Sequence, residues 1–330
     1  MRILYMISVQ GTKFGDPKEV LKLVEDEDPI PSEGEVTIDL VSAPINPSDV
    51  MLIKGLYPRK IEFPATFGNE GIAKVSKLGE NVTNVKVGDL VLIPIGNPTW
   101  RSKMVVKGKS VFPLPPADPL QMAMLSINPP TAYLMLQNFV KLEQNDWVIQ
   151  NAANSAVGRY IIQLSKILGY RTINVVRRQE LVEELKDIGA DIVLVDGPNL
   201  SKQLREKIGT DEVKLGIDAV SGSASDRLLH CLSSKATLLV YGAMSLEPIT
   251  VSMPVLMAKD VTVKTFWLSH WYMTTPRDEI QNLFTKLMPM IIHKQLFAKV
   301  AATYPLREFQ TAIEHADKEG KDGKVLFFQE

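Results

Sequence analysis

The segment Trp147-Val-Ile-Gln-Asn-Ala-Ala-Asn-Ser-Ala-Val-Gly158 decides the fold class of this 330-residue chain. The apolar run from Trp147 to Asn151 predicts a buried strand, and apolar residues recur at helical spacing from Val157 to Leu168. The turn between them is built from small residues, which would let a phosphate group approach the backbone N–H groups at a helix N-terminus. The alternative is an ordinary tight turn capped by Asn154 or Ser155.

Strands and helices alternate on the C-terminal side of this segment. Further strands are expected at 171–176, 191–195, 215–220, 237–241 and 261–266. Such alternation predicts a parallel sheet covered by helices on both faces, and right-handed crossovers make it doubly wound. The strand 261–266 would lie at the edge of this sheet, where it could pair with a second copy, so we expect a homodimer.

The residues N-terminal to this segment follow a different pattern. Residues 1–120 contain short strands and frequent prolines, which disfavour long helices and suit a small, irregular β-barrel. Residues 1–11 are expected to be a first strand rather than a signal peptide. The helices and strands after residue 276 are expected to return the chain to this first domain.

Composition excludes several classes of function. Lys and Arg number 37 and Asp and Glu number 38, so the formal net charge is −1 and gives no overall field for nucleic acid or an anionic membrane. The single cysteine, Cys231, excludes a disulfide framework, a four-cysteine zinc site and a redox pair. No apolar stretch is long enough for a membrane span. We therefore expect a cytoplasmic protein with neither nucleic acid nor membrane as a partner.

The end of the second predicted strand favours one nicotinamide cofactor. NAD sites usually carry an Asp or Glu at this point, which binds the ribose 2′-hydroxyl. Here the strand ends in Val176-Arg177-Arg178-Gln179, and two guanidinium groups suit the 2′-phosphate of NADPH. The alternative is that both arginines lie on an ordinary solvated surface.

Taken together, these features resemble the medium-chain dehydrogenase/reductase superfamily over essentially the whole chain. The resemblance rests on Ile45-Asn-Pro-Ser-Asp49, Pro64-Ala-Thr-Phe-Gly-Asn-Glu-Gly71, Val87-Gly-Asp89 and the turn at 151–158. Zinc-containing members carry Gly-His-Glu where this chain has Gly68-Asn69-Glu70, so we expect no metal and place the chain in the zinc-free branch. The resemblance implies a Rossmann domain at 123–267 that binds NADPH, and a GroES-like β-barrel domain at 1–122 and 268–330.

Within the zinc-free branch, the chain is most similar to mitochondrial-type 2-enoyl thioester reductases. The similarity lies in segments 55–57, 98–101, 128–133, 151–155, 171–177, 241–244 and 266–269. It implies a metal-free reductase that transfers hydride from NADPH to a conjugated carbonyl, most concretely a trans-2-enoyl thioester of coenzyme A or acyl carrier protein. A quinone reductase is the alternative of the same class, and an NADPH-binding sensor or structural protein is the alternative of another class.

The resemblance also implies a set of site residues. Tyr57 matches the family's catalytic tyrosine; its protonated hydroxyl could donate a hydrogen bond to the charge that develops during hydride transfer. The alternative is a tyrosine packed at the rim with its hydroxyl in water. Two departures from the family are Ala156, where glycine is usual, and Pro58 after Tyr57. The implied cofactor contacts are Asn128 at the nicotinamide end; Asn154, Ser155, Ala156 and Val157 at the pyrophosphate; Arg177, Arg178 and Gln179 at the adenosine phosphate; and Tyr241, Gly242, Ala243, Met244, Phe266, Trp267, Leu268 and Lys324 at the nicotinamide pocket.

Overall fold

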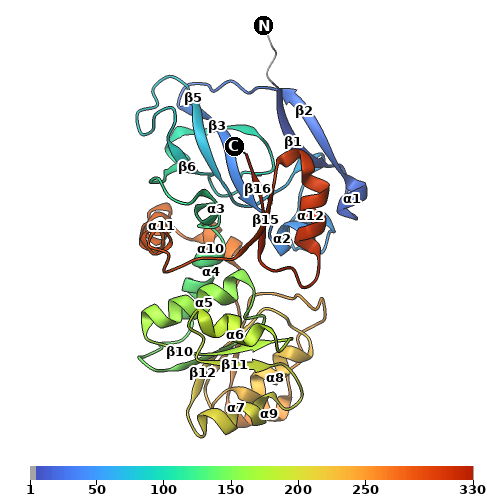
Figure 1. The fold of residues 1–330 in the computed structure, drawn as a ribbon, viewed down its shortest axis with the longest axis vertical. Helices are drawn as coiled ribbons and strands as arrows, with labels where there is room; N and C mark the ends of the chain where they lie inside the picture. Colours follow the sequence, from blue (N-terminus) through green and yellow to red (C-terminus); the bar gives the residue numbers. More distant parts are fainter. Residues whose placement is uncertain (1–4, 330) are drawn as a thin grey trace. The chain divides into compact units, whose positions relative to one another are not determined.

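The computed structural model describes residues 5–329, which form two compact units (Figure 1). Unit 1 contains residues 5–127, 284–292 and 298–329, and unit 2 contains residues 128–283 and 293–297. The chain thus leaves unit 1 and later returns to it. The domain limits expected at 122/123 and 267/268 remain predictions. In the division of the chain into compact units, residues 268–283 belong to unit 2.

Unit 2 is built on a six-stranded sheet in which every neighbouring pair is parallel. The strand order is β11-β10-β9-β12-β13-β14, so the order reverses beside β9, as expected for a doubly wound sheet. The edge position predicted for strand 261–266 is also found, because β14 pairs only with β13 among the strands of residues 5–329. The strands are β9 (Trp147–Gln150), β10 (Arg171–Val176), β11 (Ile192–Val195), β12 (Val213–Asp218), β13 (Thr237–Val240) and β14 (Thr262–Thr265).

Helices cover both faces of this sheet because alternate strand residues point to opposite sides. Ile173 and Val175 of β10 belong to a buried cluster with residues of α7 and α8, whereas Val176 belongs to a second cluster with residues of α5 and α6. The helices of unit 2 are α4 (Asn128–Gln137), α5 (Ala156–Leu168), α6 (Leu181–Asp187), α7 (Leu200–Ile208), α8 (Ser223–Cys231), α9 (Met253–Lys259) and α10 (Leu268–Thr274), and α11 (Arg277–Ile292) begins in unit 2 and ends in unit 1.

Unit 1 is rich in short strands, as the proline density predicts. One sheet has the order β2-β1-β4, and the other has the order β15-β16-β3-β5-β6-β8, with β7 also paired to β3. The strands are β1 (Tyr5–Gly11), β2 (Leu21–Glu27), β3 (Glu35–Pro44), β4 (Ala65–Thr66), β5 (Ile72–Leu78), β6 (Leu90–Leu92), β7 (Lys103–Lys107), β8 (Phe112–Pro113), β15 (Val300–Tyr304) and β16 (Lys324–Phe328). The helices are α1 (Pro17–Val20), α2 (Pro47–Ile53), α3 (Pro119–Met122) and α12 (Phe309–Asp317), with 3₁₀ turns η1 (Gly108–Ser110) and η2 (Leu306–Glu308). Residues 1–4 of the expected first strand lie outside the described residues.

The C-terminal return completes the core of unit 1. Strand β16 pairs antiparallel with the end of β3, where Leu326 lies opposite Pro44. Phe327 and Trp100 are both fully buried, and their rings meet edge to face at 5.4 Å. This pairing places Lys324, at the start of β16, beside the segment that leads from β3 into α2. None of the helices within residues 5–329 combines the length and the hydrophobicity that a membrane span requires.

Candidate functional site

The turn after β9 has the geometry of an anion site. Helix α5 begins at Ala156, and the hydroxyl of its N-cap, Ser155, accepts a hydrogen bond from the N–H of Gly158 at 3.1 Å. The other N–H groups of a first helical turn have no partner within the helix, and they are the groups that bind phosphate. The cap proposed as the alternative therefore exists, and it coexists with a turn able to hold an anion.

Gly158 allows α5 to approach the turn closely. A Cβ atom at this position would lie 2.5 Å from the carbonyl oxygen of Ala153 and 2.7 Å from its Cα. The side-chain amide of Gln150 donates to the carbonyl oxygen of Gly158 at 2.9 Å and to Oδ1 of Asn174 at 2.8 Å, which ties the helix start to the sheet. Only glycine fits this contact, and the resulting close approach is what a pyrophosphate-binding turn requires.

Asp218 is a buried carboxylate that joins the turn to the end of β12, and it is not among the residues predicted from the sequence. Its Oδ1 accepts hydrogen bonds from Nδ2 of Asn151 at 2.6 Å and from the N–H groups of Val220 and Ser221 at 2.8 and 3.0 Å. Its Oδ2 accepts from the hydroxyl of Ser225 at 2.5 Å. A carboxylate directly after an apolar strand, followed by Ser221-Gly222-Ser223, was the available sequence signal.

The segment after β13 lies against the segment that follows β12. The N–H of Tyr241 donates to the carbonyl oxygen of Asp218 at 2.9 Å. Burial raises the pKa of Tyr241, so its hydroxyl remains protonated at neutral pH. A Cβ on Gly242 would lie 2.7 Å from the carbonyl oxygen of Ala219. The structure thus places Tyr241 and Gly242 against Asp218 and Ala219, while Ala243 and Met244 are exposed.

Two further parts of the predicted nicotinamide site show contrasting environments. Phe266 is buried, and its ring meets that of Phe139 edge to face, whereas Trp267 is exposed and Leu268 is half-buried. Asn128 at the start of α4 is buried, and its Nδ2 has no hydrogen-bond partner among the described residues. A buried amide donor without an acceptor is costly for the folded state. The amide group of a nicotinamide would supply a matching acceptor.

The two arginines predicted for the 2′-phosphate follow β10 directly. Arg177, Arg178 and Gln179 are all exposed, and Arg178 lies 3.6 Å from Glu180. Strands β9 and β10 are parallel neighbours, so the phosphate turn and the arginines leave the same edge of the sheet.

Arg159, which the sequence did not single out, links the phosphate turn to the helix that follows the arginines. Its Nε donates to the carbonyl oxygen of Asn154 at 3.3 Å, and its Nη2 donates to Glu184 of α6 at 2.6 Å. The Arg159 side chain is 7% exposed and that of Glu184 30%, so this ion pair is better shielded than one on the surface.

The observations in unit 2 fit NADPH. The close contact at Gly158, the capped helix start and the Asn128 amide without a partner each match one part of a dinucleotide, and the exposed arginines match its 2′-phosphate. Lys324 is the predicted cofactor residue that lies in unit 1.

Unit 1 holds a buried polar network around Lys324. The ammonium of Lys324 donates to Oδ1 of Asn46 at 2.5 Å, and Nδ2 of Asn46 donates to Glu70 at 2.8 Å. The backbone N–H of Asn46 donates to Asp49 at 2.7 Å. Burial raises the pKa of Asp49 and of Glu70, each to about 7, and lowers the pKa of Lys324. In this structure, Lys324 is therefore engaged with residues of its own unit.

Tyr57, the predicted catalytic residue, lies in a loop that follows α2. It is half-buried and packs against the core of unit 1. Its backbone oxygen accepts a hydrogen bond from the N–H of Arg59 at 2.7 Å. The structure places Tyr57 in unit 1 and most of the predicted cofactor residues in unit 2, so their joint action stays a prediction.

The thiol of Cys231 is shielded from solvent. Cys231 is buried in α8, and burial raises the pKa of its thiol to about 12, which makes it a poor nucleophile at neutral pH. Over residues 5–329, no group of three or more His, Cys, Asp or Glu side chains is arranged to hold a metal ion.

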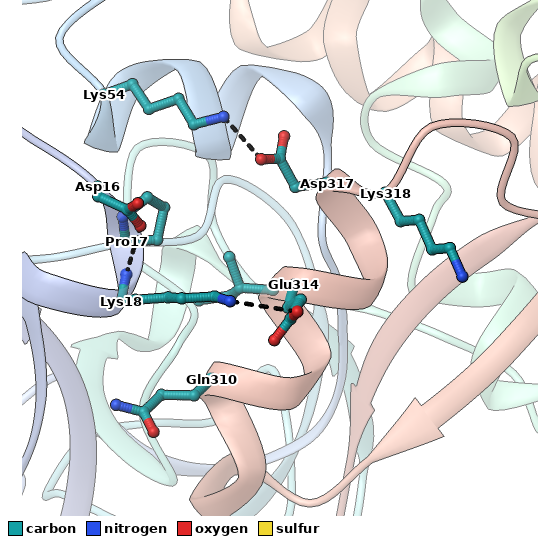
Figure 2. Close-up of a pocket in the computed structure, with 9 residues that line it drawn as sticks. Asp16, Pro17, Lys18, Lys54, Gln310, Glu314, Asp317 and Lys318 are labelled. Carbon is teal, nitrogen blue, oxygen red and sulfur yellow. Dashed lines mark hydrogen bonds and ion pairs between the residues drawn. The ribbon is translucent and has the colours of Figure 1, made fainter.

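A separate surface hollow of about 450 Å³ in unit 1 contains none of the predicted site residues (Figure 2). Figure 2 shows Lys54 directed at Asp317 and Lys18 directed at Glu314, with N–O distances of 2.6 and 3.2 Å. These ion pairs connect α12 to α2 and to α1. We interpret the hollow as part of the packing of α12 against its neighbours.

Comparison with known proteins identifies the family. Residues 32–115 match the family model described as alcohol dehydrogenase GroES-like domain, and residues 156–288 match the one described as zinc-binding dehydrogenase. The mitochondrial enoyl-[acyl-carrier-protein] reductase of Homo sapiens is 37% identical over 311 residues, which cover 92% of this chain and 83% of that protein. The chain belongs to the mitochondrial enoyl thioester reductase branch of the medium-chain dehydrogenase/reductase superfamily.

Solved structures of similar proteins share the fold of this branch. One, described as an NADPH:quinone reductase from Bacillus thuringiensis, has a TM-score of 0.90 and 30% identity. Another, Etr1p in complex with NADP and crotonyl-CoA, has a TM-score of 0.89 and 29% identity. Each match covers 99% of this chain and 100% of the other. The name "zinc-binding dehydrogenase" describes the wider family; in this chain, Asn69 stands where the zinc-containing members carry histidine.

Proposed function

We propose that this chain reduces the carbon–carbon double bond of a trans-2-enoyl thioester, with hydride from NADPH. In this reaction the hydride adds to the β-carbon and a proton adds to the α-carbon. The observation that carries the proposal is the close contact at Gly158, with Arg177 and Arg178 at the end of the neighbouring strand, in a chain 37% identical to an enoyl reductase. The protein is an oxidoreductase that uses NADPH.

Different residues of unit 2 would bind different parts of the cofactor. The N–H groups at the start of α5 would bind the pyrophosphate, and Arg177 and Arg178 would bind the 2′-phosphate. Nδ2 of Asn128 would donate to the amide oxygen of the nicotinamide. When bound, NADPH supplies the hydride. These assignments are supported by the orphaned Asn128 amide and by the Ser155 cap at the helix start.

Tyr57 would act on the substrate rather than on the cofactor. Negative charge grows on the thioester oxygen as hydride arrives, and a hydroxyl that donates to this oxygen stabilises the transition state more than the ground state. Removing one such donor commonly lowers kcat about 100- to 1000-fold.

A quinone reductase is the second candidate function, favoured by the similarity to the structure described as an NADPH:quinone reductase. A quinone already delocalises the added charge, so its reduction needs no dedicated tyrosine donor. The two candidates therefore differ in their dependence on Tyr57.

The test measures NADPH oxidation by the purified chain with crotonyl-CoA and with a simple benzoquinone, for the wild type and for Tyr57→Phe. Enoyl reduction predicts turnover of crotonyl-CoA that falls at least 100-fold in Tyr57→Phe. Fast quinone turnover that is indifferent to Tyr57→Phe, with no turnover of crotonyl-CoA, would support the second candidate. Binding of NADPH without oxidation by either acceptor would instead indicate a sensor or structural protein.

We also propose that the chain forms a homodimer through β14. This edge strand is exposed at all four residues, and exposed apolar side chains lie near it in sequence, including Met257, Trp267 and Met273. Pairing two copies of β14 would satisfy the unpaired backbone groups of both edges. Sedimentation of the wild type as a monomer at micromolar concentration would reject this proposal.

We also propose that the protein is located in the cytoplasm. The similar human protein is named as mitochondrial, so the competing location is the mitochondrion. Cell fractionation with antibody detection of the native protein distinguishes the two.

A further inference from the structure

We propose that Asn69 and Arg59 are positioning residues that hold the loop carrying Tyr57 in its working position. The inference rests on the proposed function, because it assumes that the Tyr57 hydroxyl contacts the substrate. It concerns residues 54–60, which we call the Tyr57 loop. This loop lies between the end of α2 and an extended segment of unit 1.

The first end of the Tyr57 loop is fixed to the C-terminal part of α2. The N–H of Leu56 donates to the carbonyl oxygen of Met51 at 2.8 Å, and the N–H of Gly55 donates to the carbonyl oxygen of Leu52 at 3.1 Å. Gly55 adopts a φ of +75°, which turns the chain away from the helix axis. These contacts fix the backbone up to the residue before Tyr57.

The second end is fixed through a chain of three side chains. Nη1 of Arg59 donates to Oδ1 of Asn69 at 3.1 Å, and Nδ2 of Asn69 donates to Oδ1 of Asp49 at 2.6 Å. Asp49 is fully buried in α2, where its other oxygen accepts the N–H of Asn46. Both ends of the loop therefore return to the same helix, and Tyr57 lies between them.

The chemistry of position 69 explains why an amide suits it. The guanidinium of Arg59 can only donate, and the carboxylate of Asp49 accepts, so the group between them must accept on one side and donate on the other. Asn69 meets both requirements. Asn69 is half-buried and Asp49 is buried, so this connection is less exposed to water than the Arg59 contact alone. Where zinc-containing relatives carry a ligand histidine, this chain has a residue that connects a loop to a helix.

Loss of the second anchor would let the Tyr57 hydroxyl move while the first anchor remains. A misplacement of about 1 Å in a reacting group can cost on the order of 100-fold in rate. With one of two anchors intact, we expect a smaller loss, roughly 10-fold in kcat with crotonyl-CoA. The affinity for NADPH should change little, because neither Asn69 nor Arg59 is among the assigned cofactor residues.

The experiment uses the full chain and compares Asn69→Leu and Arg59→Met with the matched control Lys60→Met. Lys60 is the exposed neighbour of Arg59, and its replacement removes the same charge but no contact in the chain of three side chains. Arg59 is exposed, so Arg59→Met keeps the test valid if Asn69→Leu fails to fold. Each substitution is made in the wild type and in Tyr57→Phe, and kcat with crotonyl-CoA is measured together with the Kd for NADPH.

Asn69→Leu and Arg59→Met should each lower kcat about 10-fold when Tyr57 is present, and less than 2-fold in the Tyr57→Phe background. Lys60→Met should keep the wild-type kcat. An equal loss in both backgrounds, or none in either, overturns the inference while leaving the function of Tyr57 intact. If Tyr57→Phe alone keeps full activity with crotonyl-CoA, the role proposed for Tyr57 fails, and the inference fails with it.

Discussion

Replacing Gly158 by alanine tests the close contact at the phosphate turn most directly. The new Cβ would lie 2.5 Å from the carbonyl oxygen of Ala153 and 2.7 Å from its Cα and carbonyl carbon. Carbon atoms attract best at roughly 3.5–4.0 Å, so α5 and the turn must separate by about 0.8 Å. All three atoms that the new Cβ would meet belong to the backbone, and Ala153 is fully buried, so no flexible side chain can relieve the contact.

Two opposing effects set the expected loss of stability for Gly158→Ala. Overpacking of this kind costs roughly 1–3 kcal/mol, whereas alanine gains about 1 kcal/mol over glycine inside a helix. We therefore expect the free energy of unfolding to fall by about 1 kcal/mol, within a range of roughly 0–2 kcal/mol. The Kd for NADPH should rise about 10-fold, equivalent to about 1.4 kcal/mol, because the displaced N–H groups at the start of α5 are those assigned to the pyrophosphate.

The assay combines urea unfolding with titration of NADPH fluorescence, and Gly197→Ala is the matched control. A Cβ on Gly197 meets nothing within 4 Å, so this variant should keep the stability and the NADPH affinity of the wild type. If Gly158→Ala were at least as stable as the wild type and bound NADPH equally well, the contact with Ala153 would not limit the turn. That result would mean that the helix-forming gain of alanine outweighs the contact with Ala153.

Three further predictions concern the cofactor, the stability of unit 2 and the dependence on pH. The exposed pair Arg177→Met/Arg178→Met should lower kcat/KM for NADPH about 10- to 100-fold and leave that for NADH nearly unchanged, since charged hydrogen bonds contribute about 1.5–3 kcal/mol; steady-state kinetics with both cofactors check this. Asp218→Ala leaves the Asn151 amide and two backbone N–H groups without an acceptor, so unfolding should become easier by roughly 3 kcal/mol, and Asp218→Asn, which keeps one oxygen, should recover part of the loss in the same urea assay. The pKa of Glu70 is raised to about 7, so its protonated form favours the folded state; the contribution is full below about pH 4.5 and is lost as the pH rises through 7. The permanently neutral Glu70→Gln should therefore show a smaller fall in Tm between pH 5 and 8 than the wild type, and equal slopes would contradict the pKa.

Local sequence patterns were sufficient to predict the kind of fold and the kind of cofactor. Apolar runs of strand length, alternating with apolar residues at helical spacing, specify a parallel doubly wound sheet because both faces of such strands must be buried. Small residues between strand and helix, followed one strand later by Arg177 and Arg178, indicate a phosphate turn and a 2′-phosphate. These are local patterns, so they can be recognised without knowing which distant residues meet.

Which side chains meet could be learned only from the folded chain. Asp218 meets Asn151 across 67 positions of sequence, and Lys324 meets Asn46 across 278, so no local pattern could reveal either pair. Asn69 could be recognised from the sequence as the residue that replaces a metal ligand, but its contacts with Asp49 and Arg59 could not. A hydrogen bond depends on the positions of two atoms in space, and those positions are fixed only when separate strands and helices pack into one core.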